Sequence, residues 1–351
     1  MTYRAGIIGT GGVAGMGIYG GSEDDIDDEP VDASHAGGYA AAEDVELVAV
    51  ADIDEDALDR FGRAWEIPED ARYLGHEAML EAADLDVVSV CTPSMFHREH
   101  VEDAAQIGDV DAIWCEKPIA CSVTDAEAMV ETCEAAGTEL VVNHSQRFYR
   151  QHQRLREAIA DGLIGEVRSV TSGSTMELLR VGTHVVDLVL YLLDGDLDLA
   201  SGYVTGERQA TNLAETDIDD AGAGGFLVLE DGTFVTFDGT PRRDVGEWHY
   251  RLTGTEGHLV SAEDGWRHFD ADGAEREPPL GEHDDDHEDS FANAAGHAVD
   301  LIEGDAENVS SGADAVRTLA ALVGFYASHH TGGRVSLPLD RPLKDVTIRS
   351  W

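Results

Sequence analysis

The chain has 351 residues, with 71 aspartates and glutamates against 23 lysines and arginines, and its formal net charge is −48. A field this negative repels nucleic-acid backbones and anionic lipid headgroups, so neither nucleic acid nor a membrane is an expected partner. The length is sufficient for two domains, each with its own hydrophobic core.

The distribution of charge indicates the surroundings of the protein. Acidic residues occur along the whole chain, and Lys117 and Lys344 are its only lysines. This composition favours a halophile, haloarchaeal or otherwise salt-accumulating, because molar salt shortens the Debye length to about 3 Å. An acidic protein of an ordinary cytosol is the alternative. The chain shows neither a signal sequence nor an apolar run of about 20 residues, and its four cysteines form no CxxC pair, so we expect a cytoplasmic protein.

Residues 1–145 alternate short apolar runs with amphipathic stretches. The runs are residues 5–8, 45–51, 87–91, 112–115 and 140–142. Runs that are β-branched and apolar on both faces are typical of parallel strands buried on both sides. Repeated strand–helix units predict an α/β fold, with a doubly wound Rossmann domain over residues 1–145.

A glycine-rich segment follows the first predicted strand. Gly9 permits a tight turn, Gly11 lets a pyrophosphate approach the backbone, and Ala14 is small enough for close packing of the next helix on the sheet. The predicted phosphate-binding residues are Gly9, Thr10, Gly11, Gly12, Val13 and Ala14. The helix that follows is expected to point its N-terminus at the phosphates.

Asp52 lies at the predicted tip of the second strand, where a carboxylate binds the ribose hydroxyls of NAD. It is farther from the glycines than the usual spacing of about 20 residues. An acidic insertion over about residues 22–38 explains the excess, and the first helix is then expected in the segment 35–44. A carboxylate here would repel a 2′-phosphate, so NAD is favoured over NADP.

Residues 146–351 show a different pattern, which predicts an α+β domain on an antiparallel sheet. We expect a helix over residues 149–162 and a hairpin over 224–240, with Asp-Gly at its turn. Two more helices are expected near residues 291–302 and 313–329.

Four segments together resemble the Gfo/Idh/MocA family of nicotinamide-dependent oxidoreductases. They are CTPSMFH (91–97), CEKP (115–118), GTHVVDLVLYLLDG (182–195) and GRVSLPLD (333–340). The resemblance implies a Rossmann domain followed by a domain with an open, mostly antiparallel sheet. It also implies a homodimer or homotetramer assembled through that sheet, and oxidation or reduction at a secondary alcohol of a sugar, inositol or nucleotide sugar.

In the family, the lysine that matches Lys117 lies beside the nicotinamide and the reacting carbon–oxygen bond. A guanidinium stays protonated in proteins, whereas an ammonium shifts its pKa readily when desolvated near another cation. Lys117 is therefore expected to polarise the substrate oxygen and to exchange a proton with it.

The resemblance makes His184 a general base toward the hydroxyl. Many members carry an aspartate four residues earlier, where this chain has Arg180. Asp187 or Glu177 could orient His184 instead, or it acts without a carboxylate partner. Arg180 suggests a substrate with a carboxylate or phosphate, since guanidinium binds both bidentately; a surface arginine is the alternative.

The resemblance assigns further residues to the site. Cofactor contacts are expected from Thr92, Pro93, His97, Glu116 and Lys117. Substrate contacts are expected from Asn143, His144, Arg147, Arg180 and Asp187. We expect no metal site, because His97 and His100 fit the start of a helix and His283 and His287 fit a solvated acidic loop.

The favoured function is that of an NAD-dependent dehydrogenase acting on a sugar, an inositol or a sugar derivative. If Arg180 binds the substrate, that substrate carries an anionic group. One alternative is a glycosidase or lyase of the same fold that oxidises the sugar transiently and restores its NAD. Another is a nucleotide-sensing regulator without catalysis, against which the presence of both Lys117 and His184 argues.

Overall fold

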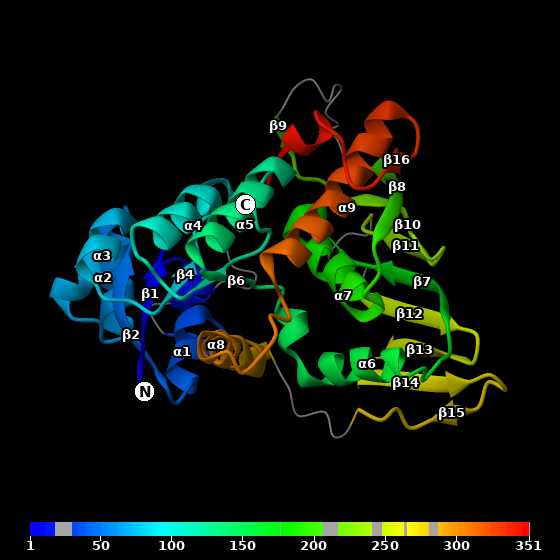
Figure 1. The fold of residues 1–351 in the computed structure, drawn as a ribbon, viewed down its shortest axis with the longest axis horizontal. Helices are drawn as coiled ribbons and strands as arrows, with labels where there is room; N and C mark the ends of the chain where they lie inside the picture. Colours follow the sequence, from blue (N-terminus) through cyan, green and yellow to red (C-terminus); the bar gives the residue numbers. More distant parts are fainter. Residues whose placement is uncertain are drawn as a thin grey trace. The chain divides into compact units, whose positions relative to one another are not determined.

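The computed structural model describes residues 1–17, 30–175, 177–205, 217–240, 248–262, 265–280 and 287–350. The chain forms two compact units (Figure 1). The first comprises Met1–Ala120, Ala126–Tyr149 and Asp285–Ala313, and the second Cys121–Asp125, Arg150–Asp284 and Asp314–Trp351.

The first unit contains a six-stranded parallel sheet in the order β3-β2-β1-β4-β5-β6. Its strands are β1 (Tyr3–Ile8), β2 (Val45–Ala51), β3 (Arg72–Tyr73), β4 (Val87–Val90), β5 (Ala112–Cys115) and β6 (Glu139–Val142). All five predicted strands are present, and the Rossmann fold is confirmed. The strand order reverses between β1 and β4, which is where such sheets bind ligands at their carboxyl ends.

Helices cover both faces of this sheet; Figure 1 shows α4 and α5 over one face and α1 and α8 over the other. Their bounds are α1 (His35–Ala41), α2 (Glu55–Ala64), α3 (His76–Ala82), α4 (His97–Gln106), α5 (Val123–Ala136) and α8 (His287–Glu303).

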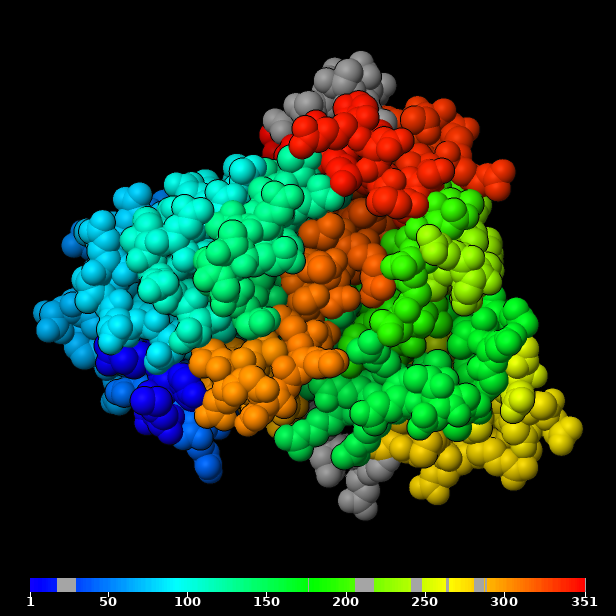
Figure 2. Space-filling view, in the orientation of Figure 1, coloured from blue at the N-terminus to red at the C-terminus, as the bar shows by residue number. Residues whose placement is uncertain are grey.

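Helix α8 extends the first unit beyond the predicted boundary at residue 145. Its apolar side chains share one buried cluster with α1 and β5, including Phe291, Tyr39 and Trp114. In Figure 2 the atoms of α8 (orange) lie against those of the N-terminal segment (blue). This shared core places residues 285–313 with the Rossmann sheet.

The segment after the glycines begins as a short π-helical turn, Gly12–Met16, rather than as a continuous helix. Helix α1 starts only at His35, with the hydroxyl of Ser34 accepting a hydrogen bond from the N–H of Gly37. The predicted insertion therefore ends before Gly38, and its first residues, 22–29, lie outside the described part of the chain.

The second unit contains a nine-stranded sheet in the order β15-β14-β13-β12-β7-β11-β10-β8-β16. All its pairs are antiparallel except β7 with β11. Its strands are β7 (Val167–Gly173), β8 (Leu197–Val204), β10 (Ala223–Leu229), β11 (Phe234–Asp238), β12 (His249–Gly254), β13 (Gly257–Ala262), β14 (Gly265–Asp270), β15 (Glu275–Arg276) and β16 (Val335–Ser336). The predicted hairpin is β10–β11, and Gly232 takes its turn at a φ of 86°.

Three helices and a small parallel pair of strands complete the described part of the second unit. They are α6 (Arg150–Ala160), α7 (Thr183–Leu193), α9 (Gly312–Thr331), β9 (Asp217–Asp219) and β17 (Thr347–Arg349). The four cysteines of the chain form no disulfide with one another, and all four are buried. None of the described helices combines the length and apolar character needed to cross a bilayer.

Candidate cofactor and catalytic site

The glycine loop after β1 has the geometry of a phosphate cradle. Gly9 has a φ of 90°, and a Cβ there would lie 2.8 Å from Cγ2 of Thr92. A Cβ on Gly11 would meet nothing within 4 Å, so its backbone borders open space. Ala14 is fully buried beneath the turn. The loop thus needs glycine at position 9 and leaves room for phosphate at position 11.

Asp52 lies at the tip of β2 and is tied to this loop. Its Oδ2 accepts hydrogen bonds from the N–H of Thr10 at 2.6 Å and from the Thr10 hydroxyl at 2.9 Å, while Oδ1 accepts one from the N–H of Asp54 at 2.9 Å. A half-buried carboxylate can accept hydrogen bonds from ribose hydroxyls, and an open glycine turn lets a pyrophosphate approach the backbone. These residues therefore fit a dinucleotide.

His97, predicted as a cofactor contact, is buried and braces two loops. Its Nε2 lies 2.7 Å from the carbonyl oxygen of Thr92, and its Nδ1 lies 3.1 Å from those of Pro118 and Ile119. Burial lowers the pKa of His97, although its backbone partners oppose this. The ring therefore joins the loop after β4 to the E-K-P segment.

Glu116 is buried at the end of β5 and has several hydrogen-bond partners. Its Oε1 lies 3.1 Å from Nε2 of His35 and accepts a hydrogen bond from Nδ2 of Asn143 at 2.5 Å. Its Oε2 accepts the N–H of Lys117 at 3.3 Å. Burial alone would raise the pKa of Glu116, but His35, Lys117 and Asn143 lower it to about 2. The carboxylate is therefore ionised beside a half-buried Lys117.

The predicted substrate residues of the first unit are all buried. The side-chain amide of Asn143 donates a hydrogen bond to Glu116, and its main-chain N–H donates to the carbonyl of Cys115 at 2.7 Å. Oδ1 of Asn143 lacks a hydrogen-bond partner among the described residues. Arg147 is 1% exposed and donates to the carbonyl of Val309 at 2.9 Å. This hydrogen bond joins the turn Ser145–Phe148 to the segment before α9, and the substrate contact of Arg147 stays a prediction. His144 is 2% exposed.

His184 lies in the first turn of α7 and is half-buried. Its ring stacks on Trp248, with ring centroids 5.4 Å apart and an angle of 29° between the planes. Asp187 points into the core of this unit, where its Oδ1 accepts the hydroxyl of Thr318 at 2.9 Å. The first turn of α7 thus presents an imidazole that stacks on an aromatic neighbour.

The turn before α7, Leu178–Gly182, is held by a carboxylate that the sequence did not indicate. Asp220 accepts the N–H groups of Leu179 and Arg180 at 3.0 and 2.9 Å, and the hydroxyl of Tyr326 at 2.9 Å. Burial raises the pKa of Asp220 to about 6, with Glu177 adding to the effect and the hydrogen bonds opposing it. The side chain of Arg180 is exposed.

Residues 3–144 match the model of the Gfo/Idh/MocA oxidoreductase family with an NAD-binding Rossmann fold. The chain is 30% identical over 338 residues to a D-apiose dehydrogenase of Paraburkholderia graminis, covering 87% of this chain and 86% of the relative. The chain belongs to this oxidoreductase family. It is also 32% identical over 187 residues to a D-glucoside 3-dehydrogenase of Escherichia coli, where the match spans only 50% of that relative.

Solved structures of family-like oxidoreductases show the same fold. An oxidoreductase from Agrobacterium radiobacter, in complex with NAD+, L-tartaric acid and magnesium, superposes with a TM-score of 0.76 at 21% identity over 96% of this chain and 98% of that one. An aldose-aldose oxidoreductase from Caulobacter crescentus gives 0.75 at 21% identity, covering 96% of this chain and 100% of that one. At this identity the likeness concerns the fold alone.

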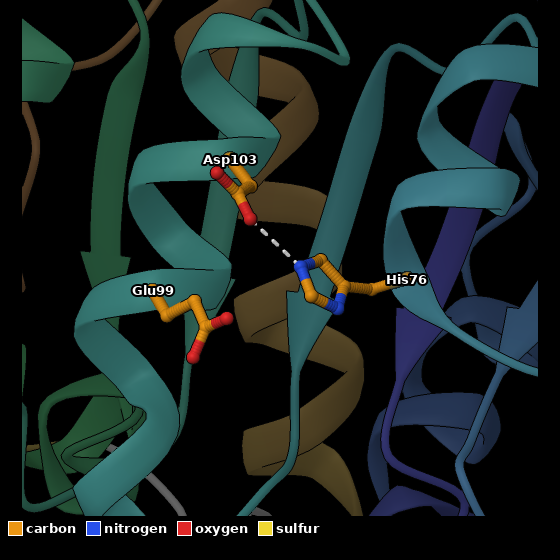
Figure 3. Close-up of side chains that lie close together, drawn as sticks. All are labelled: His76, Glu99 and Asp103. Carbon is orange, nitrogen blue, oxygen red and sulfur yellow. Dashed lines mark hydrogen bonds and ion pairs between the residues drawn. The ribbon is translucent and has the colours of Figure 1, made fainter.

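One cluster elsewhere in the oxidoreductase has metal-ligand chemistry. His76 at the start of α3 and Glu99 and Asp103 on α4 place ligand atoms within 4.8 Å of one another (Figure 3). Nε2 of His76 lies 2.8 Å from Oδ2 of Asp103, whereas Glu99 is exposed. The pairing accounts for two members, and exposed acids are common in this chain, so we assign no metal here. Nδ1 of His100 lies 2.9 Å from Oγ1 of Thr92.

Pro93 is exposed at the start of the turn Ser94–Phe96, and Thr92 is half-buried beside the glycine loop. Three residues near the candidate site, His35, Asp220 and Trp248, were not predicted from the sequence. His35 lies in a segment taken partly as insertion, and the other two carry no local motif. A histidine early in the first helix of a Rossmann unit was the available signal for the first of them.

Proposed function

We propose that the chain is an NAD-dependent dehydrogenase that oxidises or reduces a secondary alcohol of a sugar, inositol or sugar derivative. The strongest support is the arrangement around Lys117, where a buried, ionised Glu116 accepts the N–H of the lysine at the carboxyl end of β5. The names of the relatives, which include dehydrogenases of D-apiose, D-glucosides and inositol, support this substrate class.

In this proposal the turn at Gly9 and Gly11 binds the pyrophosphate, and Asp52 binds the ribose hydroxyls and disfavours a 2′-phosphate. NAD, when bound, supplies the hydride acceptor. Lys117 polarises the substrate oxygen, and Lys117 or His184 takes the hydroxyl proton as the hydride leaves carbon. Trp248 orients the ring of His184. The exposed Arg180 favours a substrate that carries a carboxylate or phosphate.

A screen of sugars, inositols and sugar acids in molar potassium chloride, followed by NADH absorbance, tests this function. We expect NADH to accumulate with at least one alcohol and to do so faster with NAD than with NADP. Bound NAD that survives purification, with sugar turnover but no net NADH, would instead indicate the transient-oxidation enzyme. Nucleotide binding without turnover of any alcohol would indicate the regulator.

We also propose that the chain is halophilic and cytoplasmic. Its −48 formal charges repel one another strongly once screening is lost, because the Debye length grows to about 30 Å at 0.01 M salt. The melting temperature should fall steeply as potassium chloride is removed. An unchanged melting temperature between molar and millimolar salt would contradict the proposal.

The nine-stranded sheet supports a homodimer or homotetramer. Phe226 on β10 and Phe234 on β11 have ring centroids 5.1 Å apart, and Phe234 is 40% exposed. Aromatic side chains on the outer face of a sheet are common in homomeric interfaces. Light scattering in molar salt should give a mass of two or four chains; a monomer would exclude the proposal.

A further inference from the structure

Buried polar side chains form a continuous hydrogen-bonded row in the first unit. The hydroxyl of Tyr39 lies 2.6 Å from that of Ser89, which lies 2.8 Å from Nδ1 of His35. Nε2 of His35 lies 3.1 Å from Oε1 of Glu116, which also accepts the amide of Asn143. The row therefore runs from α1, through β4, to the ends of β5 and β6.

The donors and acceptors of this row can be matched along its whole length. Burial raises the pKa of Tyr39, so its phenol is protonated and can donate to Ser89. Ser89 can then donate to Nδ1 of His35, and Nε2–H of His35 donates to Glu116. In this assignment each proton has one acceptor. The ring is further held by Trp114, with centroids 3.8 Å apart.

This row ends at the main chain of the E-K-P segment. The second oxygen of Glu116 accepts the N–H of Lys117 at 3.3 Å, while His97 lies against the carbonyls of Pro118 and Ile119 from the other side. We propose that His35 is a positioning residue, which acts through Glu116 to fix the backbone of Lys117 and the charge beside its ammonium. The catalytic meaning of this inference rests on the proposed function.

Three other titratable groups of the described residues interact with Glu116, namely His97, Cys91 and Cys115. Burial lowers the pKa of His97 and raises those of Cys91 and Cys115 well above the ordinary value. These three groups are neutral near pH 7. A buried carboxylate that loses one donor is no longer held in a single orientation and moves toward other donors. Loss of His35 should therefore weaken the negative charge beside Lys117.

The chain offers a direct readout because it contains only two lysines. Lysine labelled with 13C at Cε gives two NMR signals, and Lys344→Arg identifies the one from Lys117. The signal is titrated in the unmutated protein, in Glu116→Gln, in His35→Leu and in His35→Gln, which keeps an N–H donor. His76→Gln is the matched control, since it breaks another histidine–carboxylate pair of the same unit.

We expect Glu116→Gln to lower the titration midpoint of Lys117 by about one pH unit, since an opposite charge at this range is worth that much or more. His35→Leu should shift it in the same direction, and His35→Gln should restore most of the original value. His76→Gln should change nothing. In the Glu116→Gln background the His35 substitutions should lose their effect, as expected if His35 acts through that carboxylate.

A Lys117 signal that titrates alike in the unmutated protein, His35→Gln and Glu116→Gln would overturn the proposal, whether or not His35→Leu folds. A His35 effect that persists in the Glu116→Gln background would also overturn it. The readout needs no substrate. If no alcohol yields NADH while Lys117 responds as expected, the proposed function fails and the positioning role of His35 stands.

Discussion

Two carboxylates, the buried Glu116 and the half-buried Asp220, each accept hydrogen bonds from main-chain N–H groups next to a candidate catalytic residue. Glu116 in the first unit precedes Lys117, and Asp220 in the second unit holds the turn that leads to His184. Burial by itself would raise the pKa of each carboxylate. The net result differs, because the pKa of Glu116 is lowered to about 2 and that of Asp220 is raised to about 6.

The difference lies in the partners rather than in the number of hydrogen bonds. Glu116 faces the imidazole of His35 and the ammonium of Lys117. Asp220 receives neutral N–H and phenol donors and has Glu177 beside it. Neutral donors offset only part of the desolvation of a carboxylate, whereas a cation offsets more. Glu116 thus stays ionised across neutral pH, whereas Asp220 changes protonation near pH 6.

Substitution of the cation tests the Lys117 side and should have the largest effect. Lys117→Arg keeps the positive charge but removes the exchangeable proton and introduces a broader head. We expect turnover to fall by about 10²–10⁴-fold, the usual worth of general acid–base help, with little change in NAD affinity. The activity found in the substrate screen is the measurement, and Lys344→Arg is the matched control. Near-normal turnover in Lys117→Arg would show that charge alone suffices.

The pH dependence of stability tests the Asp220 side. The folded pKa of about 6 lies above the unfolded value of 3.8, so the folded state binds more protons between them. This group therefore stabilises the fold most below pH 4, and that contribution is lost as pH rises through 6. The loss amounts to about 3 kcal/mol, from about two pKa units. In Asp220→Asn this decline should disappear from denaturant unfolding curves at constant salt.

Glu116→Gln is the contrasting variant in the same experiment. The folded pKa of about 2 lies below the ordinary 4.5, so the contribution of Glu116 is fully present above pH 4.5 and is lost only as pH falls through 2. Between pH 5 and 7 its stability curve should run parallel to that of the unmutated protein. Parallel curves for Asp220→Asn as well would remove the contrast between the two carboxylates.

Cofactor choice depends on a third carboxylate, which is half-buried and accepts neutral donors from the glycine loop. Asp52→Ala should weaken NAD binding by about tenfold or more, since hydrogen bonds to charged groups contribute about 1.5–3 kcal/mol. NADP binding should weaken less, because the repulsion of its 2′-phosphate is also removed. Fluorescence titration with both dinucleotides measures the ratio. Equal affinity of the unmutated protein for NAD and NADP would refute the role of Asp52.

The sequence predicted what local patterns determine. Five apolar runs became strands of the parallel sheet, the Asp-Gly turn became the β10–β11 hairpin, and the glycines, Asp52 and E-K-P lie at carboxyl ends of strands. These features follow from periodicity, turn chemistry and motifs of a few residues. Residues that meet only through tertiary packing could not be predicted in this way.

Asp220, Trp248 and His35 show why the rest was missed. Asp220 is 40 residues from Arg180, and 81 residues separate His35 from Glu116. Trp248 lies in a separate segment from α7. Helix α8 has an apolar face that fits any sheet, and only its packing with Tyr39 and Trp114 assigns it to the first unit.

The smallest expected effect concerns how the two functional histidines are held. His35 has hydrogen-bond partners at both ring nitrogens, whereas the ring of His184 stacks on a partly exposed Trp248. An aromatic pair contributes about 0.5–1.5 kcal/mol beyond burial, so Trp248→Leu should lower kcat about 2–10-fold. Trp248→Phe keeps a ring and should retain most of the rate. Because the stack orients the base rather than binding the cofactor, NAD affinity should stay constant in both variants. Equal kcat values for Trp248→Leu and the unmutated enzyme would show that His184 needs no aromatic support, and equal losses in both variants would indicate that Trp248 contacts the substrate itself.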